Sequence, residues 1–181
     1  MVVVDYDKKW IDDFLKIKNE LNKVLTVSCQ VQHVGSTSIP GMKAKPIIDI
    51  DVGLENWNDF DAVKKALAAI GYEHEGDRGI KGREAFGRNG SVHNKILDSI
   101  DHHLYVCSYE NEEYKRHILF RDYLRNHTDA RDRYNQIKEE ILVKVGSDNR
   151  AGYVQMKEEE YKDFFEEIIE KAKALTINTL S

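Results

Sequence analysis

The first part of the chain alternates between helical and strand-like hydrophobic patterns. Apolar residues recur at spacings of three and four over 6–26, which predicts an amphipathic helix there. Two apolar segments follow, at 27–34 and 46–52, and each has the length of a strand. A second helical pattern begins after Asn58, a suitable N-cap, and stops at Gly71. This part of the chain therefore reads helix, strand, strand, helix.

The next segment carries weaker strand patterns. Over 72–90, glycines and charged residues interrupt short alternations, so we expect one or two strands joined by loops. The segment 96–106, ILDSIDHHLYV, predicts a longer strand. Because successive side chains of a strand point to opposite faces, Asp101, His103 and Tyr105 would share one face.

Helical patterns dominate the chain beyond Ser108. They predict three helices, at 114–126, 130–145 and 153–174. Gly146 would end the second of them, and the tail 175–181 is expected to fray. The sequence therefore predicts an α/β (α+β) fold in a single domain, 1–181. Its α/β core would occupy 1–108 and its helical C-terminal part 109–174.

Composition and charge narrow the class of protein. The 181 residues include 27 Lys and Arg against 32 Asp and Glu, so the net charge is −5, and the basic residues are dispersed. This balance argues against a protein that mainly holds nucleic acid or a membrane surface. Cys29 and Cys107 lie far apart and indicate neither a zinc site nor a disulfide framework. Without an apolar run of membrane-spanning length or a signal-peptide pattern, the expected location is the cytoplasm.

The most informative stretch is 33–51, HVGSTSIPGMKAKPIIDID. Asp49 and Asp51 stand at alternate positions of an apolar strand, so both carboxylates leave the sheet on one face, roughly 7 Å apart. Two carboxylates inside an apolar run cost stability unless a cation lies between them. Their oxygens suit Mg²⁺, which prefers carboxylate and phosphate ligands. We therefore expect Asp49 and Asp51 to hold magnesium.

The turn before this strand suits a phosphate group. Gly35 allows close approach of backbone N–H groups, and Ser36 adds a hydroxyl donor with Thr37 beside it. The alternative is an ordinary turn followed by two solvated carboxylates, since Gly-Ser is a common dipeptide. The acidic pair on the very next strand favours the metal-phosphate interpretation.

This combination of turn and strand resembles the GrpB-like family, a bacterial branch of the nucleotidyltransferase superfamily. Family members typically read close to HIGSTSVPGLAAKPIIDI, and this chain reads HVGSTSIPGMKAKPIIDI. The resemblance continues through HHLY at 102–105, FRDYLR at 120–125 and the spaced pairs Tyr134–Lys138 and Tyr153–Lys157. It implies a nucleotidyltransferase-like core of mixed strands with flanking helices, and a site for a nucleotide.

The resemblance also suggests how the site is completed. The superfamily usually supplies a third carboxylate from a neighbouring strand, and Asp101 or His103 would take that place. His103 can coordinate a metal, bind a phosphate or transfer a proton, and the alternative is a half-buried histidine hydrogen-bonded within the sheet. The family commonly has a further histidine where Tyr105 stands, which weakens the case for two-metal catalysis. Lys45 would meet a triphosphate, as the resemblance favours, or lie in solvent.

Cationic residues elsewhere offer further phosphate ligands. Arg83 and Arg88 flank a short alternation and would both clamp a phosphate over the site, unless they lie on a solvated strand face. The pairs Tyr134–Lys138 and Tyr153–Lys157 each share a helix face. Such pairs can line an anionic pocket or simply pack on the surface with the lysine stem over the ring.

Two functions fit these residues. The first is a Mg²⁺-dependent nucleotidyltransferase that moves a nucleotidyl group from a nucleoside triphosphate to an unknown acceptor. Gly35 and Ser36 would hold the triphosphate, Asp49 and Asp51 the metal, and Asp101 or His103 would complete the site. The second is a non-catalytic module that senses a nucleotide or a phosphorylated metabolite with the same pocket.

Overall fold

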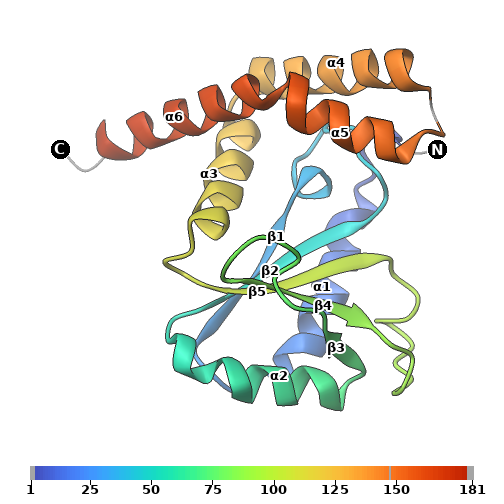
Figure 1. Cartoon of the computed structure of the whole chain (residues 1–181), viewed down its shortest axis with the longest axis vertical. Coiled ribbons are helices and arrows are strands. Elements are labelled where there is room, and N and C mark those ends of the chain that lie inside the picture. Colours follow the sequence, from blue (N-terminus) through green and yellow to red (C-terminus); the bar gives the residue numbers. More distant parts are fainter. Residues whose placement is uncertain (1–2, 147, 179–181) are drawn as a thin grey trace.

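A computed structural model describes residues 3–146 and 148–178, and it contains a mixed sheet flanked by helices (Figure 1). The sheet has the strand order β1-β2-β5-β4-β3. Its strands are β1 (Cys29–Val34), β2 (Ile48–Leu54), β3 (Tyr72–His74), β4 (Arg83–Arg88) and β5 (His102–Ser108). The pair β2–β5 is parallel and the other three pairs are antiparallel. The predicted mixed-strand α/β class is therefore confirmed.

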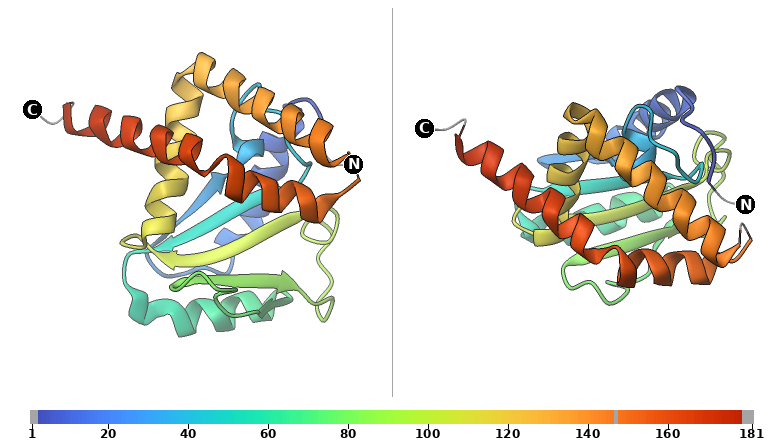
Figure 2. Two further views of the ribbon diagram at one scale, coloured as in Figure 1. Left: turned by 45° about the horizontal axis from the view of Figure 1, so that its top comes forward. Right: turned by 90° about the horizontal axis from the view of Figure 1, so that it is seen from above.

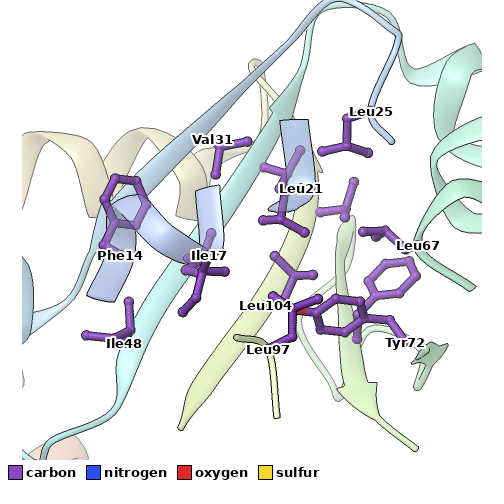
Figure 3. Close-up of a cluster of buried hydrophobic side chains, with 14 of the residues drawn as sticks. Phe14, Ile17, Leu21, Leu25, Val31, Ile48, Leu67, Tyr72, Leu97 and Leu104 are labelled. Atoms are coloured by element: carbon purple, nitrogen blue, oxygen red, sulfur yellow. The ribbon is translucent and has the colours of Figure 1, made fainter. Parts of the chain in front are cut away.

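One face of the sheet packs against α1 (Lys9–Asn22) and α2 (Phe60–Ala69). The alternation of β2 sends Ile48, Ile50 and Val52 into this core, which is closed by apolar side chains of both helices (Figure 3). Because alternate residues point the other way, Asp49 and Asp51 leave the sheet on its opposite face. The apolar pattern of one strand thus fixes where its carboxylates point.

The chain beyond β5 forms α3 (Glu112–Asn126), α4 (Thr128–Val145), α5 (Arg150–Glu160) and α6 (Lys162–Asn178). In Figure 1 helices α4–α6 lie at the top of the view and α2 at the bottom, with the sheet between them, and Figure 2 shows the same helices from two further sides. Helices α3–α6 pack around a second hydrophobic core. It includes Ile39, Met42, Leu124, Tyr134, Ile137, Ile141, Tyr153 and Ile168. Ile39 and Met42 come from the connection between β1 and β2, so this connection is anchored in the helical part. None of the described helices is long and apolar enough to cross a bilayer.

Several predicted boundaries are wrong for local reasons. The strand expected over 96–106 begins only at His102, because the Asn94 side chain accepts hydrogen bonds from the N–H groups of Ile96 and Leu97 and folds 95–99 into turns. Asn58 is not an N-cap, since α2 follows a 3₁₀ turn, η2 (Trp57–Asp59), that Asn56 caps.

The helical part also differs from its prediction. The single helix expected over 153–174 is two helices, α5 and α6, separated at Tyr161, whose φ of −114° and ψ of 14° are not helical. The tail is helical as far as Asn178, so fraying from 175 is not seen there, and 179–181 lie outside the described residues. Gly146 does end α4, with a φ of 84°.

Candidate active site

A cavity of about 570 Å³ lies between the acidic face of the sheet and the helical part. The sheet contributes Asp49 and Asp51 from β2, Tyr105 from β5 and Arg83 from β4. Side chains from α3, α5 and α6 close the other side, among them Arg116, His117, Lys157, Lys162, Phe165 and Glu166. Gly35 and Ser36 also line it, so the predicted turn and acidic pair meet at one cavity.

Asp51 is the most enclosed polar group at this cavity. Its side chain is fully buried, and its Oδ2 accepts a hydrogen bond of 2.7 Å from Nδ1 of His117 on α3. Its Oδ1 is buried and has no hydrogen-bond partner among the described residues. A buried carboxylate oxygen left unsatisfied is costly, so this atom is a candidate ligand position for a cation.

Asp49 is more open, with 35 % of its side chain exposed. Its Oδ1 accepts a hydrogen bond of 2.9 Å from Nδ1 of His103, its register partner on β5. Its Oδ2 lies against Gly35, where a Cβ would come within 2.3 Å of it. Gly35 also has a φ of 67°, so both the conformation and the contact require glycine here. The turn at Gly35 therefore packs directly against β2, the strand that carries Asp49 and Asp51.

The turn continues as a short 3₁₀ segment, η1 (Ser36–Ser38), which α3 and α4 hold from outside. Arg125 donates from Nε and Nη2 to the carbonyl of Ser38, at 3.0 and 2.8 Å. Arg121 donates to the carbonyl of His33 at 3.1 Å. Two arginines of α3 therefore hold the backbone on either side of the phosphate-binding candidate Ser36.

Lys138, on α4, also holds the turn that carries Ser36. It is buried, and its Nζ donates to Ser36 Oγ at 2.8 Å and to the carbonyl of Lys43. The Nζ also lies 4.2 Å from the ring centroid of Tyr134. Burial, assisted by the positive charge of Lys157, holds the pKa of Lys138 well below its usual value. The Tyr134–Lys138 pair is thus buried at the turn and is not a surface pair.

The two arginines of β4 have different surroundings. Arg83 lines the cavity, with its guanidinium carbon 4.1 Å from the ring centroid of Tyr105 and its buried Nε without a partner among the described residues. Arg88 points to the other face, where it pairs with Asp98 and donates to the carbonyl of Val92. The expectation that both clamp one phosphate is wrong, because residues five apart in a strand point to opposite faces.

The remaining predicted residues are divided between the site and its surroundings. Asp101 is exposed just before β5 and is not among the described residues that line the cavity, so the structure brings His103 and not Asp101 to the acidic pair. Thr37 is buried and shares a hydrogen bond of 3.0 Å with His33. Lys45 lines a second cavity of about 400 Å³ beside the first.

Sequence reasoning missed the contribution of α3. His117 and Arg116, both on α3, line the cavity opposite the strands. The only local signal is that His117 precedes Arg121 by one helical turn, so the two share a face of α3. That spacing does not reveal which strand the face meets.

The donor set suits one hard cation better than two. Among the described residues there is no cluster of three or more His, Cys, Asp or Glu arranged to hold a metal ion. Two carboxylates with one unsatisfied buried oxygen nevertheless fit Mg²⁺, which commonly takes one or two protein carboxylates and completes its shell with phosphate oxygens and water. Asp49 and Asp51 are the residues that would hold it.

The mixed sheet, the Gly-Ser turn and the acidic pair on the following strand define an α/β protein with a nucleotidyltransferase-like fold. A family model described as "GrpB protein" matches residues 1–171, and the chain belongs to this family. The resemblance seen in the sequence is thereby confirmed.

Individual relatives agree with this assignment. The chain is 31 % identical to the glutamate-rich protein GrpB of Alkalihalophilus pseudofirmus, over 93 % of this chain and 94 % of that protein. It is 32 % identical to the protein YqkA of Bacillus subtilis over 87 % of this chain, but it spans only 44 % of YqkA. The crystal structure of the conserved protein GrpB from Enterococcus faecalis superimposes with a TM-score of 0.75 at 30 % identity, covering 93 % of this chain and 98 % of that one.

Proposed function

We propose that this protein is a Mg²⁺-dependent nucleotidyltransferase that moves a nucleotidyl group from a nucleoside triphosphate to an acceptor. The observation that carries the proposal is the buried Oδ1 of Asp51, which has no partner among the described residues. A buried carboxylate oxygen without a partner costs about 1–3 kcal/mol, and a cation bound there removes that cost.

Each residue at the cavity has a role in this proposal. Magnesium held by Asp49 and Asp51 would neutralise and orient phosphate oxygens. His103 and His117 each hold one oxygen of a carboxylate, which would leave the other oxygen of each for the cation. Gly35 would meet a phosphate through its backbone N–H, since Asp49 takes the space where a Cβ would lie.

Two further residues would bind the triphosphate directly. Ser36 accepts its hydrogen bond from Lys138, so its own hydroxyl hydrogen can be donated to a phosphate oxygen. The buried Nε of Arg83, without a partner among the described residues, would donate to a phosphate as well.

A second candidate is a sensor that binds a nucleotide without turnover. The observation that favours it is the position of Asp101, which is exposed and outside the described lining of the cavity. Without a third carboxylate, the protein groups at the cavity support one metal more readily than the pair of metals that many phosphoryl-transfer sites use.

One experiment distinguishes the transferase from the sensor. The protein is incubated with nucleoside triphosphates labelled at the α-phosphate, Mg²⁺ and a bacterial cell extract. The transferase moves label to a component of the extract, and Asp49→Asn abolishes the transfer. The matched variant Asp101→Asn leaves it intact. Tight binding of a nucleotide with no transfer in several extracts assigns the sensor function, and no binding of any nucleotide in Mg²⁺ refutes both.

A further inference from the structure

Ser36 lies where the two cavities meet. It lines both of them, while Asp51 is in the lining of the first and Lys138 in that of the second. The Nζ of Lys138 is 2.8 Å from Ser36 Oγ. The hydroxyl of Ser36 therefore contacts an amine at the second cavity, and the same residue borders the cavity proposed for the triphosphate.

The surroundings of Lys138 favour a neutral amine. Lys138 is 2 % exposed and makes no ion pair with a carboxylate among the described residues. Burial of an unpaired charge costs several kcal/mol, which is more than the attraction of about 2 kcal/mol from the ring of Tyr134. Burial and the positive charge of Lys157 together hold the pKa of Lys138 well below its usual value. A neutral amine has a lone pair and can accept a proton.

The hydrogen bond between Lys138 and Ser36 can run in either direction. A charged Lys138 donates to Ser36 Oγ and leaves the hydroxyl hydrogen for a phosphate oxygen. A neutral Lys138 still donates to the carbonyl of Lys43 and can accept the hydroxyl hydrogen through its lone pair. In the second state the oxygen of Ser36 is an activated nucleophile, as in serine enzymes that use a lysine as the base.

The backbone around Ser36 is held in place on both sides. Arg121 donates to the carbonyl of His33, and Arg125 donates to the carbonyl of Ser38. A nucleophile has to be held close to the geometry of attack, because small displacements cost much of its rate. The turn supplies such a fixed position for Ser36 Oγ.

We propose that Ser36 is a nucleophile activated by Lys138, and that it carries the nucleotidyl group as a covalent intermediate of the transfer. This inference rests on the proposed function. Ser36 Oγ attacks the α-phosphorus of the nucleoside triphosphate, and an Oγ–P bond forms. The bond between the α-phosphorus and its bridging oxygen breaks, and pyrophosphate leaves with the electron pair of that bond. The hydroxyl proton of Ser36 passes to Lys138.

The acceptor then displaces Ser36 from the nucleotidyl group. The oxygen of an acceptor hydroxyl attacks the same phosphorus and the Oγ–P bond breaks. Lys138 returns its proton to Oγ, and the proton of the acceptor passes to solvent. The negative charge of a triphosphate at the turn supports the first step, because a nearby anion makes the charged form of Lys138 less costly.

Labelling of the purified full chain, with no cell extract, tests the inference. The protein is incubated with Mg²⁺ and the common ribonucleoside triphosphates, labelled at the α-phosphate or, as the control, at the γ-phosphate. Samples are denatured at successive times, and labelled peptides are identified by mass spectrometry. We expect α label on the peptide that contains Ser36 and no γ label, because the pyrophosphate has left.

Three results of this experiment would overturn the inference. They are label on another residue, γ label on Ser36, and no covalent label although a nucleotide analogue with an uncleavable α–β bridge binds in Mg²⁺. The mapping uses wild type, so it does not depend on whether any variant folds.

Variants then assign the two roles. Ser36→Ala should take up no label. Lys138→Met should be labelled about a hundredfold more slowly, the low end of what a general base contributes, and should bind the uncleavable analogue within about threefold of wild type. A purely structural Lys138 would lower binding and labelling equally, and that result would remove its role as the base. Lys144→Met, which changes an exposed lysine of the same helix, should be labelled like wild type.

The inference and the proposed function fail separately. If label reaches a component of a cell extract but is never found on Ser36, the nucleotidyl group passes directly to the acceptor. The inference is then wrong and the proposed function stands. If the analogue does not bind in Mg²⁺, the proposed function fails, and the covalent intermediate fails with it.

Discussion

At the scale of single residues, the two aspartates of β2 lie two positions apart but have different surroundings. Asp51 is fully buried with one oxygen unpartnered among the described residues, and Asp49 is about one-third exposed. A carboxylate that only supported the fold would have both oxygens satisfied by donors. The unpartnered oxygen of Asp51 is therefore the feature that the proposed metal site would explain.

This difference predicts the behaviour of Asp51→Asn. Asparagine keeps the shape and one oxygen for His117 but carries no charge, so in EDTA the variant should unfold at the same temperature as wild type or higher. With Mg²⁺ and a nucleotide only wild type should gain binding energy. At a ligand concentration of 100 times Kd this gain is about 2.7 kcal/mol. Thermal melts of both proteins in the two buffers measure the reversal.

The control for this experiment is Asp101→Asn, because Asp101 is exposed and outside the described lining of both cavities. It should melt like wild type in each buffer. A clear loss of stability of Asp51→Asn in EDTA would mean that Asp51 supports the scaffold, and the proposed metal site would then be wrong.

His33 gives a prediction about pH. It is buried, stacks on Phe14 and has its pKa lowered from 6.5 to about 4 by burial and by the nearby positive charge of Arg125. The unfolded chain therefore binds a proton on this histidine at a higher pH than the folded protein does. Stability from His33 is present above pH 6.5 and is lost as the pH falls to 4, by about 3 kcal/mol. Urea unfolding between pH 7 and pH 4 measures it.

The variant His33→Gln should remove this part of the pH dependence. His93, whose side chain is 84 % exposed, provides the control, and His93→Gln should retain most of the acid-induced loss. If His33→Gln loses stability toward pH 4 as steeply as wild type, other groups cause the acid sensitivity.

At the scale of elements, the connection between β1 and β2 depends on helices far away in the sequence. Arg125 of α3 satisfies the buried carbonyl of Ser38. Replacing it as Arg125→Met leaves this carbonyl without its donors, which should cost about 1–3 kcal/mol of unfolding free energy. It should also weaken nucleotide binding, because the turn that carries Ser36 loses a restraint. Urea titration and nucleotide titration measure the two effects.

Arg133 of α4 is the matched control. It is exposed and pairs with Glu140 on the same helix. Arg133→Met should change stability by no more than about 0.5 kcal/mol and should not affect nucleotide binding. Equal effects of the two variants would show that the contact with the turn has no special role.

Some features of single helices and strands could be predicted from the sequence, and others could not. The period of two in Ile48, Asp49, Ile50 and Asp51 was enough to predict which face carries the carboxylates, because a strand's alternation is a local property. The break at Tyr161 was not predictable from the run of apolar positions, which continues through it. The turns within 96–106 depend on hydrogen bonds to the side chain of Asn94. The spacing of hydrophobic residues carries no information about such contacts.

At the scale of the whole molecule, the site is assembled from contacts between distant segments. His117 is 66 residues from Asp51, and Lys138 is 102 residues from Ser36. No local pattern specifies these pairs, because they follow from how the helical part packs against the sheet. The acidic pair and turn could therefore be predicted from the sequence, and the histidine and lysine that hold them could not.

The position of the cavity between the two hydrophobic cores leads to the last prediction. Its lining includes β2 on one side and α5 and α6 on the other, so the proposed nucleotide would contact both parts of the chain. With Mg²⁺ and a nucleoside triphosphate, amide exchange should slow in α5 and α6 as well as around Ser36, since opening of these helices then requires loss of the ligand. Amides of α2 and β3, which are not among the described lining residues, should exchange unchanged, and Asp51→Asn should show no slowing anywhere. Hydrogen–deuterium exchange with mass spectrometry makes the comparison. Slowing confined to the turn and β2 would mean that the helices do not close over the ligand.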